Sequence, residues 1–283
     1  MGKKVLVVFY TQSGQLEDIV NHFTQPFEEA GATVEKVRVF PEEAYPFPWT
    51  GKSFFGVMPD SVNQVPAPLK SFSFKESHYD LIVLGYQAWF LSPSIPSNSL
   101  MHDPRFIAVA KDTPVITITG ARNMWISAME KIKPTLRNIG AKLVGNIALV
   151  DRHHNFVSFV TIFHWMFKGR KDRYLNIFPK PGVSDEDITG SKKYGEITLN
   201  HLQQDNWSSL QDDLVNAGAV VIKYHLMFIE SKARKIFKVW AGIISKRKKR
   251  TAWLVAFKYY LLIALFIAAP IILTVDAIFF KPF

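Results

Sequence analysis

Cysteine is absent from this chain, and so is the lysine-bearing glycine loop with which many nucleotide-binding proteins hold phosphate. Without cysteine there is no disulfide, no thiolate nucleophile and no cluster of iron and sulfur held by thiolates. A chain without disulfides fits a reducing compartment. We also expect no secretory leader, because Lys3 and Lys4 run directly into the first apolar stretch.

Acidic residues are scarce between residues 223 and 250. Ten Lys and Arg stand there against one acid, Glu230, so this segment carries +9 of the chain's net charge of +10. Basic runs usually bind nucleic acid or an anionic membrane surface. Because an apolar tail follows directly, we expect a membrane surface as partner and no nucleic acid.

The most informative stretch lies near the start of the chain. Six apolar residues, Val5 to Tyr10, are typical of a strand buried on both faces of a parallel sheet. Apolar residues then recur at helical spacing from Leu16 onward. The polar loop between strand and helix brings backbone N–H groups and the helix dipole together, which favours phosphate binding, although a plain turn is the alternative. The loop consists of Thr11, Gln12, Ser13, Gly14 and Gln15.

Further apolar runs alternate with helical patterns along the next hundred residues. We expect strands over 32–39, 79–85, 112–118 and 142–150. Five such strands predict an α/β fold with a doubly wound parallel sheet in the flavodoxin-like order 2-1-3-4-5. A ligand then lies where strands one and three diverge. The aromatic-rich segment 41–75 has no clear period and predicts an ordered insertion over the carboxyl edge of the sheet.

Residues 1–152 resemble the flavodoxin-like superfamily in three loops. The loop after the first strand matches the superfamily's phosphate loop. A second loop matches the one that lies against the flavin ring, and it comprises Tyr86, Gln87, Ala88, Trp89 and Phe90. The third resembles a flavin-contacting loop of the quinone-reductase branch and comprises Thr119, Gly120, Ala121, Arg122, Asn123 and Met124. The resemblance implies FMN as cofactor, held by these loops (Arg122 excepted), and a homodimer, since quinone reductases of this branch share flavin sites across dimers.

Four segments, 9–15, 46–50, 120–125 and 151–155, also resemble the flavoprotein of dialkylresorcinol and flexirubin-type pigment biosynthesis. This resemblance implies an aromatase that oxidises a long-chain 2,5-dialkylcyclohexane-1,3-dione, supplied by a ketosynthase partner, to a dialkylresorcinol. One proton must leave the substrate, and hydride must pass to N5 of the flavin.

Two adjacent histidines, His153 and His154, follow the fifth strand and are our candidates for the catalytic base and an enolate hydrogen bond. Arg122 or Arg152 would supply positive charge. Ordinary loop residues or a helix cap are the alternative for both histidines. A histidine pair also suggests a metal, but no second cluster has ligand spacing, and we expect none.

The second half of the chain divides by composition into three parts. In residues 153–205 we expect an apolar helix over 155–168 and a loop that includes 180–195. We expect this helix and loop together to cover the substrate site. The helix is too short to span a bilayer and could be a buried helix, a lid over an alkyl-chain tunnel or a membrane-dipping element. Residues 206–250 predict basic amphipathic helices interrupted at Gly218.

The third part, 251–283, predicts a membrane-associating segment. It either spans the bilayer, with Lys258 snorkelling, or forms an in-plane hairpin bent at Pro270. The positive charges at 246–250 then place the flavin domain on the cytoplasmic face of the inner membrane.

Two other functions share these features. One is an NAD(P)H–quinone reductase that acts on membrane quinones. The other is a non-catalytic, membrane-anchored electron carrier, which would leave the flavin edge exposed.

Overall fold

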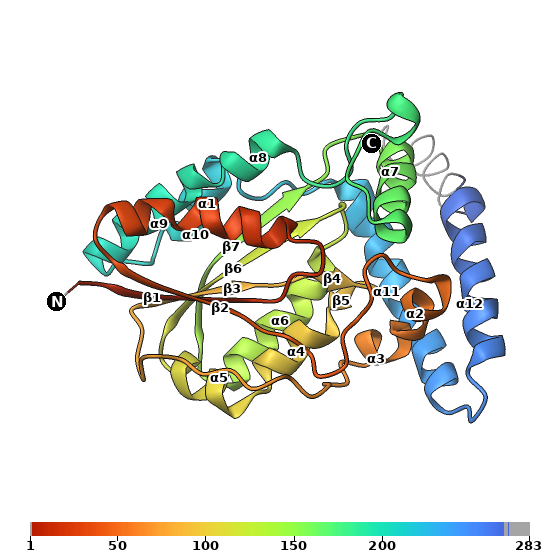
Figure 1. The fold of residues 1–283 in the computed structure, drawn as a ribbon, viewed down its shortest axis with the longest axis horizontal. Helices are drawn as coiled ribbons and strands as arrows, with labels where there is room; N and C mark the ends of the chain where they lie inside the picture. Colours follow the sequence, from red (N-terminus) through yellow and green to blue (C-terminus); the bar gives the residue numbers. More distant parts are fainter. Residues whose placement is uncertain (1, 269–270, 272–283) are drawn as a thin grey trace, which may run out of the picture.

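The computed structural model describes residues 2–268 and 271. A five-stranded parallel sheet forms its centre, with the strand order β2-β1-β3-β6-β7 (Figure 1). Counted within this sheet alone, the order is 2-1-3-4-5, so the expected fold class and flavodoxin-like topology are confirmed. The strands are β1 (Lys4–Phe9), β2 (Thr33–Arg38), β3 (Leu81–Gly85), β6 (Pro114–Ala121) and β7 (Lys142–Val150).

Helices cover both faces of the sheet because alternate strand residues point to opposite sides. Val5 and Val7 of β1 belong to the core under one layer of helices, and Leu6 and Val8 belong to the core under the other. The first layer contains α1 (Gln15–Glu29), α8 (Asp185–Thr189), α9 (Lys192–Gln204) and α10 (Leu210–Asn216). The second contains α4 (Ile95–Met101), α5 (Pro104–Ala110) and α6 (Ile126–Asn138).

The helix α9 lies directly against α1 and completes the first layer with residues that follow position 152. Gly195 permits this approach, since a Cβ atom there would lie 2.0 Å from the carbonyl oxygen of Phe23. The prediction of a loop over 180–195 is therefore wrong for much of that range. The side chain of Ser184 accepts a hydrogen bond from the backbone N–H of Asp187 and begins α8.

The remaining elements gather beyond the carboxyl ends of the strands, on the right of Figure 1. Several of them form a third apolar cluster in which Phe55, Met58, Phe237 and Phe257 are buried. These elements are a short hairpin, β4 (Ala88–Trp89) with β5 (Ser92–Pro93), and the helices α2 (Gly51–Gly56), α3 (Met58–Val62), α7 (Asn155–Lys168), α11 (Tyr224–Ser245) and α12 (Thr251–Ile263), with a 3₁₀ turn η1 (Tyr174–Asn176) and a π-helical turn η2 (Ala264–Ala268).

Among the described residues, one helical stretch is long and apolar enough to cross a membrane. It runs from Thr251 to Ala268, has a mean hydropathy of 1.8, and only 6% of it is buried. The final part of the segment expected over 251–283, including Pro270, lies outside the described residues.

Candidate active site

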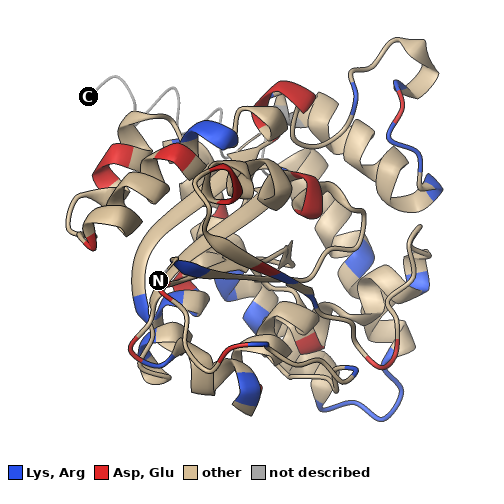
Figure 2. Ribbon diagram, turned by 60° about the vertical axis from the view of Figure 1, so that its left-hand side comes forward, with Lys and Arg blue, Asp and Glu red and all other residues tan. Residues whose placement is uncertain are grey.

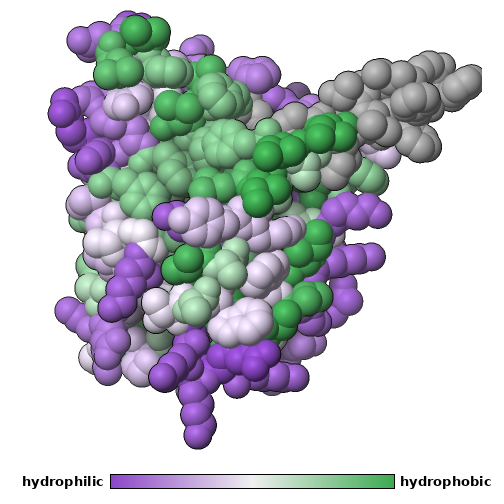
Figure 3. Space-filling model, turned by 90° about the vertical axis from the view of Figure 1, so that its right-hand side faces the viewer, coloured by the Kyte–Doolittle hydropathy of each residue, from purple (hydrophilic) through white to green (hydrophobic). Residues whose placement is uncertain are grey.

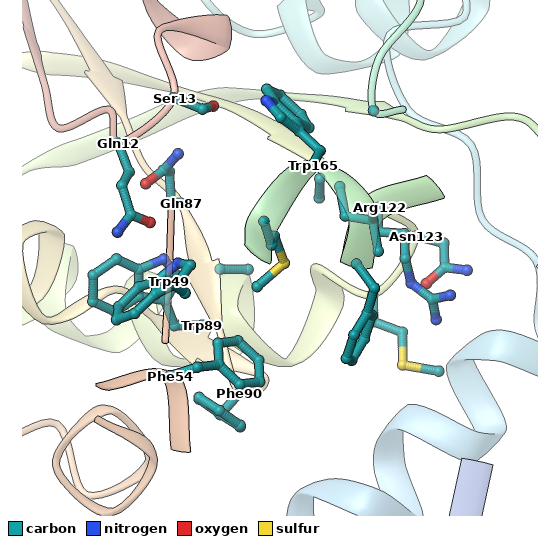
Figure 4. A pocket seen from close by; sticks show the side chains of 18 of the residues that line it. Gln12, Ser13, Trp49, Phe54, Gln87, Trp89, Phe90, Arg122, Asn123 and Trp165 are labelled. Carbon is teal, nitrogen blue, oxygen red and sulfur yellow. The ribbon is translucent and has the colours of Figure 1, made fainter. Parts of the chain in front are cut away.

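A cavity of about 310 Å³ lies at the carboxyl ends of β1, β3 and β6. All three loops that the sequence singles out line it (Figure 4). The lining residues from these loops are Gln12, Ser13, Gln15, Gln87, Ala88, Trp89, Phe90, Gly120, Ala121, Arg122, Asn123 and Met124. Thr11, Gly14, Tyr86 and Thr119 belong to the same loops but do not line the cavity.

Thr11 and Gly14 shape the first loop from within. The Thr11 hydroxyl accepts a hydrogen bond from the backbone N–H of Gly14 (3.1 Å), and Gly14 adopts a φ of +87°, which favours glycine. Arg38 supports the loop from outside by donating to the carbonyl oxygen of Thr11 (3.0 Å). The loop thus turns sharply into α1, whose first backbone N–H groups have no partner within the helix.

Gln15 lines the cavity but also holds a distant segment in place. Its side-chain amide donates to the carbonyl oxygen of Val183 and accepts from the backbone N–H of Val183, both at 3.2 Å. The adjacent Gly182 has a φ of +82°, and a Cβ atom there would lie 2.8 Å from Trp165. Residues 182–183 therefore close over the phosphate-loop side of the cavity.

The cavity is walled by aromatic rings from two separate parts of the chain. Trp89 makes edge-to-face contacts with Tyr45 and Trp49, with ring centroids 5.1 and 5.3 Å apart. Phe54 packs on Phe90 at 4.9 Å. The insertion over 41–75 thus supplies Phe47, Trp49 and Phe54 to the same cavity as the strand loops.

Phe90 and Leu91 form the turn of the β4–β5 hairpin with φ values of +48° and +60°. Two consecutive positive φ values are typical of a turn that ordinarily carries Asn and Gly. Bulky side chains in this conformation are strained, and such strain concentrates at functional sites. The strained turn directs Phe90 to the cavity and buries Leu91 in the third apolar cluster.

Tyr86, expected to stack on a flavin, is buried beneath the sheet in the core of the second layer. Burial raises the pKa of its hydroxyl, and the nearby Glu230 carboxylate raises it further. Thr119 is likewise buried. Both residues are therefore buried in the core next to the site and do not line the cavity.

Arg122 is a half-buried cation in the cavity wall. Burial lowers the pKa of its guanidinium to about 10, while the Asp151 carboxylate opposes that shift. The group therefore stays protonated at neutral pH. A desolvated guanidinium in an apolar cavity can stabilise an oxyanion strongly, because the surrounding dielectric is low.

The two histidines do not line the cavity. His153 Nδ1 lies 2.7 Å from Oδ1 of Asp151, whose other oxygen accepts from the Ser158 hydroxyl. His154 caps α7, accepting from the backbone N–H of Phe156 at 3.4 Å. Arg152 pairs with Asp187 on the surface, so Arg122 is the arginine at the cavity.

Sequence reasoning predicted one helix of the outer wall of the cavity and missed the others. The apolar pattern of 155–168 predicted a cover, which α7 provides, but nothing in the sequence signalled that α11, α12 and η2 also reach the cavity. The lining residues from these helices are Phe159, Ile162, Phe163, Trp165, Met166, Phe237, Leu261 and Leu265. In the part of the chain that the structure describes, no group of three or more His, Asp or Glu side chains could hold a metal ion.

The strand order, with a cavity at the switch between β1 and β3, defines a flavodoxin-like α/β protein. No protein-family model and no curated protein matches the chain.

Solved structures of flavoproteins show a similar fold. One is a flavoprotein in complex with FMN from Lactobacillus acidophilus (15% identity over 52% of this chain and 93% of that chain, TM-score 0.43). Others are a flavodoxin from the domain Archaea (12% identity, 71% and 99% covered, TM-score 0.39) and flavodoxin 1 from Bacillus cereus (14%, 70% and 99%, TM-score 0.36). At these identities and scores they assign neither ligand nor activity to this chain.

Proposed function

We propose that this chain is an FMN-dependent oxidoreductase that acts on an apolar cyclic dione, removing two hydrogens to yield a dialkylresorcinol. The observation that carries the proposal is the convergence of three strand loops and a helix N-terminus on one aromatic-walled cavity. The identity of the substrate comes from the sequence resemblance of the loops.

The cavity residues fit a flavin nucleotide. The loop from Thr11 to Gln15 would hold the phosphate through backbone N–H groups, and Trp89 with Phe90 would flank the ring. The side-chain oxygen of Gln87 is buried and has no hydrogen-bond partner among the described residues. An unpaired buried oxygen costs about 1–3 kcal/mol, and an N–H of a bound flavin would satisfy it.

When bound, the flavin supplies the hydride acceptor. The protein's own part is to orient the dione against the aromatic wall, exclude water and stabilise negative charge on a carbonyl oxygen. Arg122 is suited to the last task, since a carbon next to a carbonyl group loses its proton more easily when the resulting enolate meets a fixed cation. The substrate would lose a hydride to the flavin from one ring carbon and a proton to solvent from the neighbouring carbon, which is next to a carbonyl group. Enolisation of both carbonyl groups then gives the aromatic product.

His153 has an indirect role in the proposed reaction. It contacts Asp151, and the Asp151 carboxylate acts electrostatically on Arg122. We assign His153 and Asp151 the role of positioning and balancing the charge of Arg122. His154, which caps α7, has a structural role.

Attachment to a membrane is part of the same proposal. The turn between α11 and α12 carries Lys246, Arg247, Lys248, Lys249 and Arg250 in succession, and basic residues cluster there in Figure 2. The apolar helix that follows is largely uncovered. A basic turn next to an apolar helix suits the cytoplasmic surface of an anionic bilayer.

The test is a single anaerobic turnover with the detergent-purified, FMN-loaded protein. Addition of a synthetic 2,5-dialkylcyclohexane-1,3-dione should bleach the flavin absorbance near stoichiometrically and release the matching resorcinol. Addition of the resorcinol itself, as a control, should leave the flavin oxidised and its spectrum unchanged. Failure to bind FMN would refute the cofactor assignment. Bleaching by NADPH but not by the dione would favour the quinone reductase instead.

A further inference from the structure

The cavity has two chemically different walls. The inner wall, formed by the strand loops, carries the polar side chains, among them Gln12, Ser13 and Gln87. The outer wall, formed by α7, α11, α12 and η2, presents only apolar and aromatic side chains. Among them are Phe159 and Phe163 of α7, Leu261 of α12 and Leu265 of η2.

One ring contact links the outer wall to the surface of the molecule. Phe159 of α7 meets Phe266 of η2 edge to face, with ring centroids 4.9 Å apart. On the outer side of this contact, Phe266 is 44% exposed and Ile263 is 55% exposed. Figure 3 shows hydrophobic side chains gathered in a band over this face of the molecule. The contact between α7 and the C-terminal helix therefore joins a residue that lines the cavity to an exposed apolar surface.

Leu265 lies at the centre of this arrangement. It belongs to η2, where the helix widens into a π-helical turn. Such turns are rare and are frequent at functional sites. Leu265 is half-buried and faces the cavity, whereas Ile263, two residues earlier, faces away from it.

We propose that the contact between α7 and the C-terminal helix is the mouth of a channel that holds an alkyl chain of the substrate, and that the chain enters it from the lipid phase. The inference rests on the proposed function for the reaction at the inner wall and specifies a long-chain substrate. A polar substrate gains nothing from an apolar outer wall, whereas each methylene removed from water raises affinity about fourfold.

The positive charge near this helix supports a lipid phase as the source of the chain. The basic turn 246–250 stands at the start of the same helix that forms the mouth. Lys258 is also exposed along that helix. Cations beside an apolar surface attract anionic headgroups and would hold the mouth against the membrane.

The experiment compares two non-reacting product analogues, resorcinol and 4-hexylresorcinol. Their dissociation constants are measured on the full-length, FMN-loaded protein by its tryptophan fluorescence, because Trp49 and Trp165 line the cavity. The hexyl compound should bind at least about 100-fold more tightly, given about fourfold for each buried methylene. Equal binding of the two compounds would overturn the channel.

A matched pair of variants locates the channel. Leu265→Trp fills the mouth and should reduce the preference for the hexyl compound to less than tenfold. Ile263→Trp adds the same ring on the exposed side and should retain the preference. If Leu265→Trp does not fold, as judged by its bound-flavin spectrum, Leu261→Trp takes its place. An unchanged preference in the cavity-facing variant contradicts the proposal.

The outcomes separate the channel from the reaction. A hexyl preference that is lost in Leu265→Trp supports the channel even if no dione reduces the flavin. Conversely, diones with methyl and with hexyl substituents that reduce the flavin with equal kcat/KM would support the reaction and refute the channel.

Discussion

The side-chain amide of Gln15 bonds both backbone groups of Val183, a residue 168 positions later in the chain. Gln15 is the first residue of α1 and stands at the end of the phosphate loop, so this pair ties the loop to the segment that closes over it. From the sequence alone, Gln15 is predicted to contact the phosphate. The structure shows that its amide is used to fasten residues 182–183 over the site.

Replacing Gln15 with leucine should therefore weaken both stability and FMN binding. The substitution leaves the buried N–H and C=O of Val183 without partners, and each unsatisfied group costs about 1–3 kcal/mol. We expect a loss of about 2–4 kcal/mol in the free energy of unfolding, measured in urea. Gln12→Leu is the control for the unfolding measurement, because among the described residues the Gln12 amide bonds the exposed carbonyl oxygen of Pro46 and no buried group. Equal losses of stability in both variants would contradict the role assigned to Gln15.

Gly182 offers a second test of the same closure. Gly182→Ala introduces a Cβ atom 2.8 Å from Trp165 and 2.9 Å from the Gln15 amide, at a φ of +82°. Gly218→Ala is the matched control, since Gly218 has a φ of +86° but no atom within 4 Å of its would-be Cβ. Both variants bear the cost of a left-handed alanine, about 1–2 kcal/mol. Only Gly182→Ala should also raise the dissociation constant of FMN, measured by recovery of flavin fluorescence.

Arg122 should matter for the reaction more than for binding of the cofactor. Arg122→Met keeps the length of the side chain and removes the charge that would stabilise the enolate. We expect the rate of flavin reduction by the dione to fall about 100- to 1000-fold in stopped-flow measurements, the range seen when one oxyanion donor is removed. Arg152→Met removes an exposed pair with Asp187 and should leave the rate within about threefold. Comparable rates in the two variants would exclude Arg122 from the chemistry.

Most of the sheet could be predicted from the sequence, because strands buried on both faces appear as continuous apolar runs such as Val5 to Tyr10. The three predicted flavin loops follow such runs, and residues after parallel strands meet at one edge. The contribution of α11, α12 and η2 to the outer wall could not be predicted. Leu265 reaches the cavity through tertiary packing, and its apolar surroundings in the sequence equally favour a membrane segment. Ser184 before three acids is an N-cap signal that compositional reasoning on 180–195 overlooked.

The single acid of the basic segment also escaped sequence reasoning. Glu230 of α11 is buried, and its carboxylate accepts from the backbone N–H of Ser127 at 2.6 Å, capping α6 immediately after the third flavin loop. Burial raises the pKa of Glu230, outweighing its hydrogen bonds to the start of α6. An acid whose pKa is raised on folding stabilises the fold least at high pH, because the unfolded chain then gains more from ionisation.

The pH dependence of stability follows from that shift. Relative to wild type, Glu230→Gln keeps an acceptor for Ser127 and should gain stability as the pH rises above the ordinary range of a glutamate, with little difference below it. The difference grows by about 1.4 kcal/mol for each unit by which folding raises the pKa. Urea unfolding at pH 4.5 and pH 8 measures it. Glu42→Gln, an exposed carboxylate, should reproduce the wild-type pH dependence. A difference that shrinks as pH rises would show that the pKa is lowered instead.

Membrane binding should depend on the charge of the turn between α11 and α12. Each Lys or Arg near an anionic surface contributes about 1 kcal/mol, so replacing Lys246, Lys248 and Lys249 by serine should weaken binding about 100-fold. Sedimentation with vesicles of one part phosphatidylglycerol and three parts phosphatidylcholine measures this. Lys3→Ser, Lys36→Ser and Lys75→Ser together form the control, with the same loss of charge just before β1, on β2 and at the end of the insertion. If the two triple variants lose binding equally, net charge attracts the protein and the turn has no special part. If neither loses binding, the apolar helix α12 alone accounts for attachment.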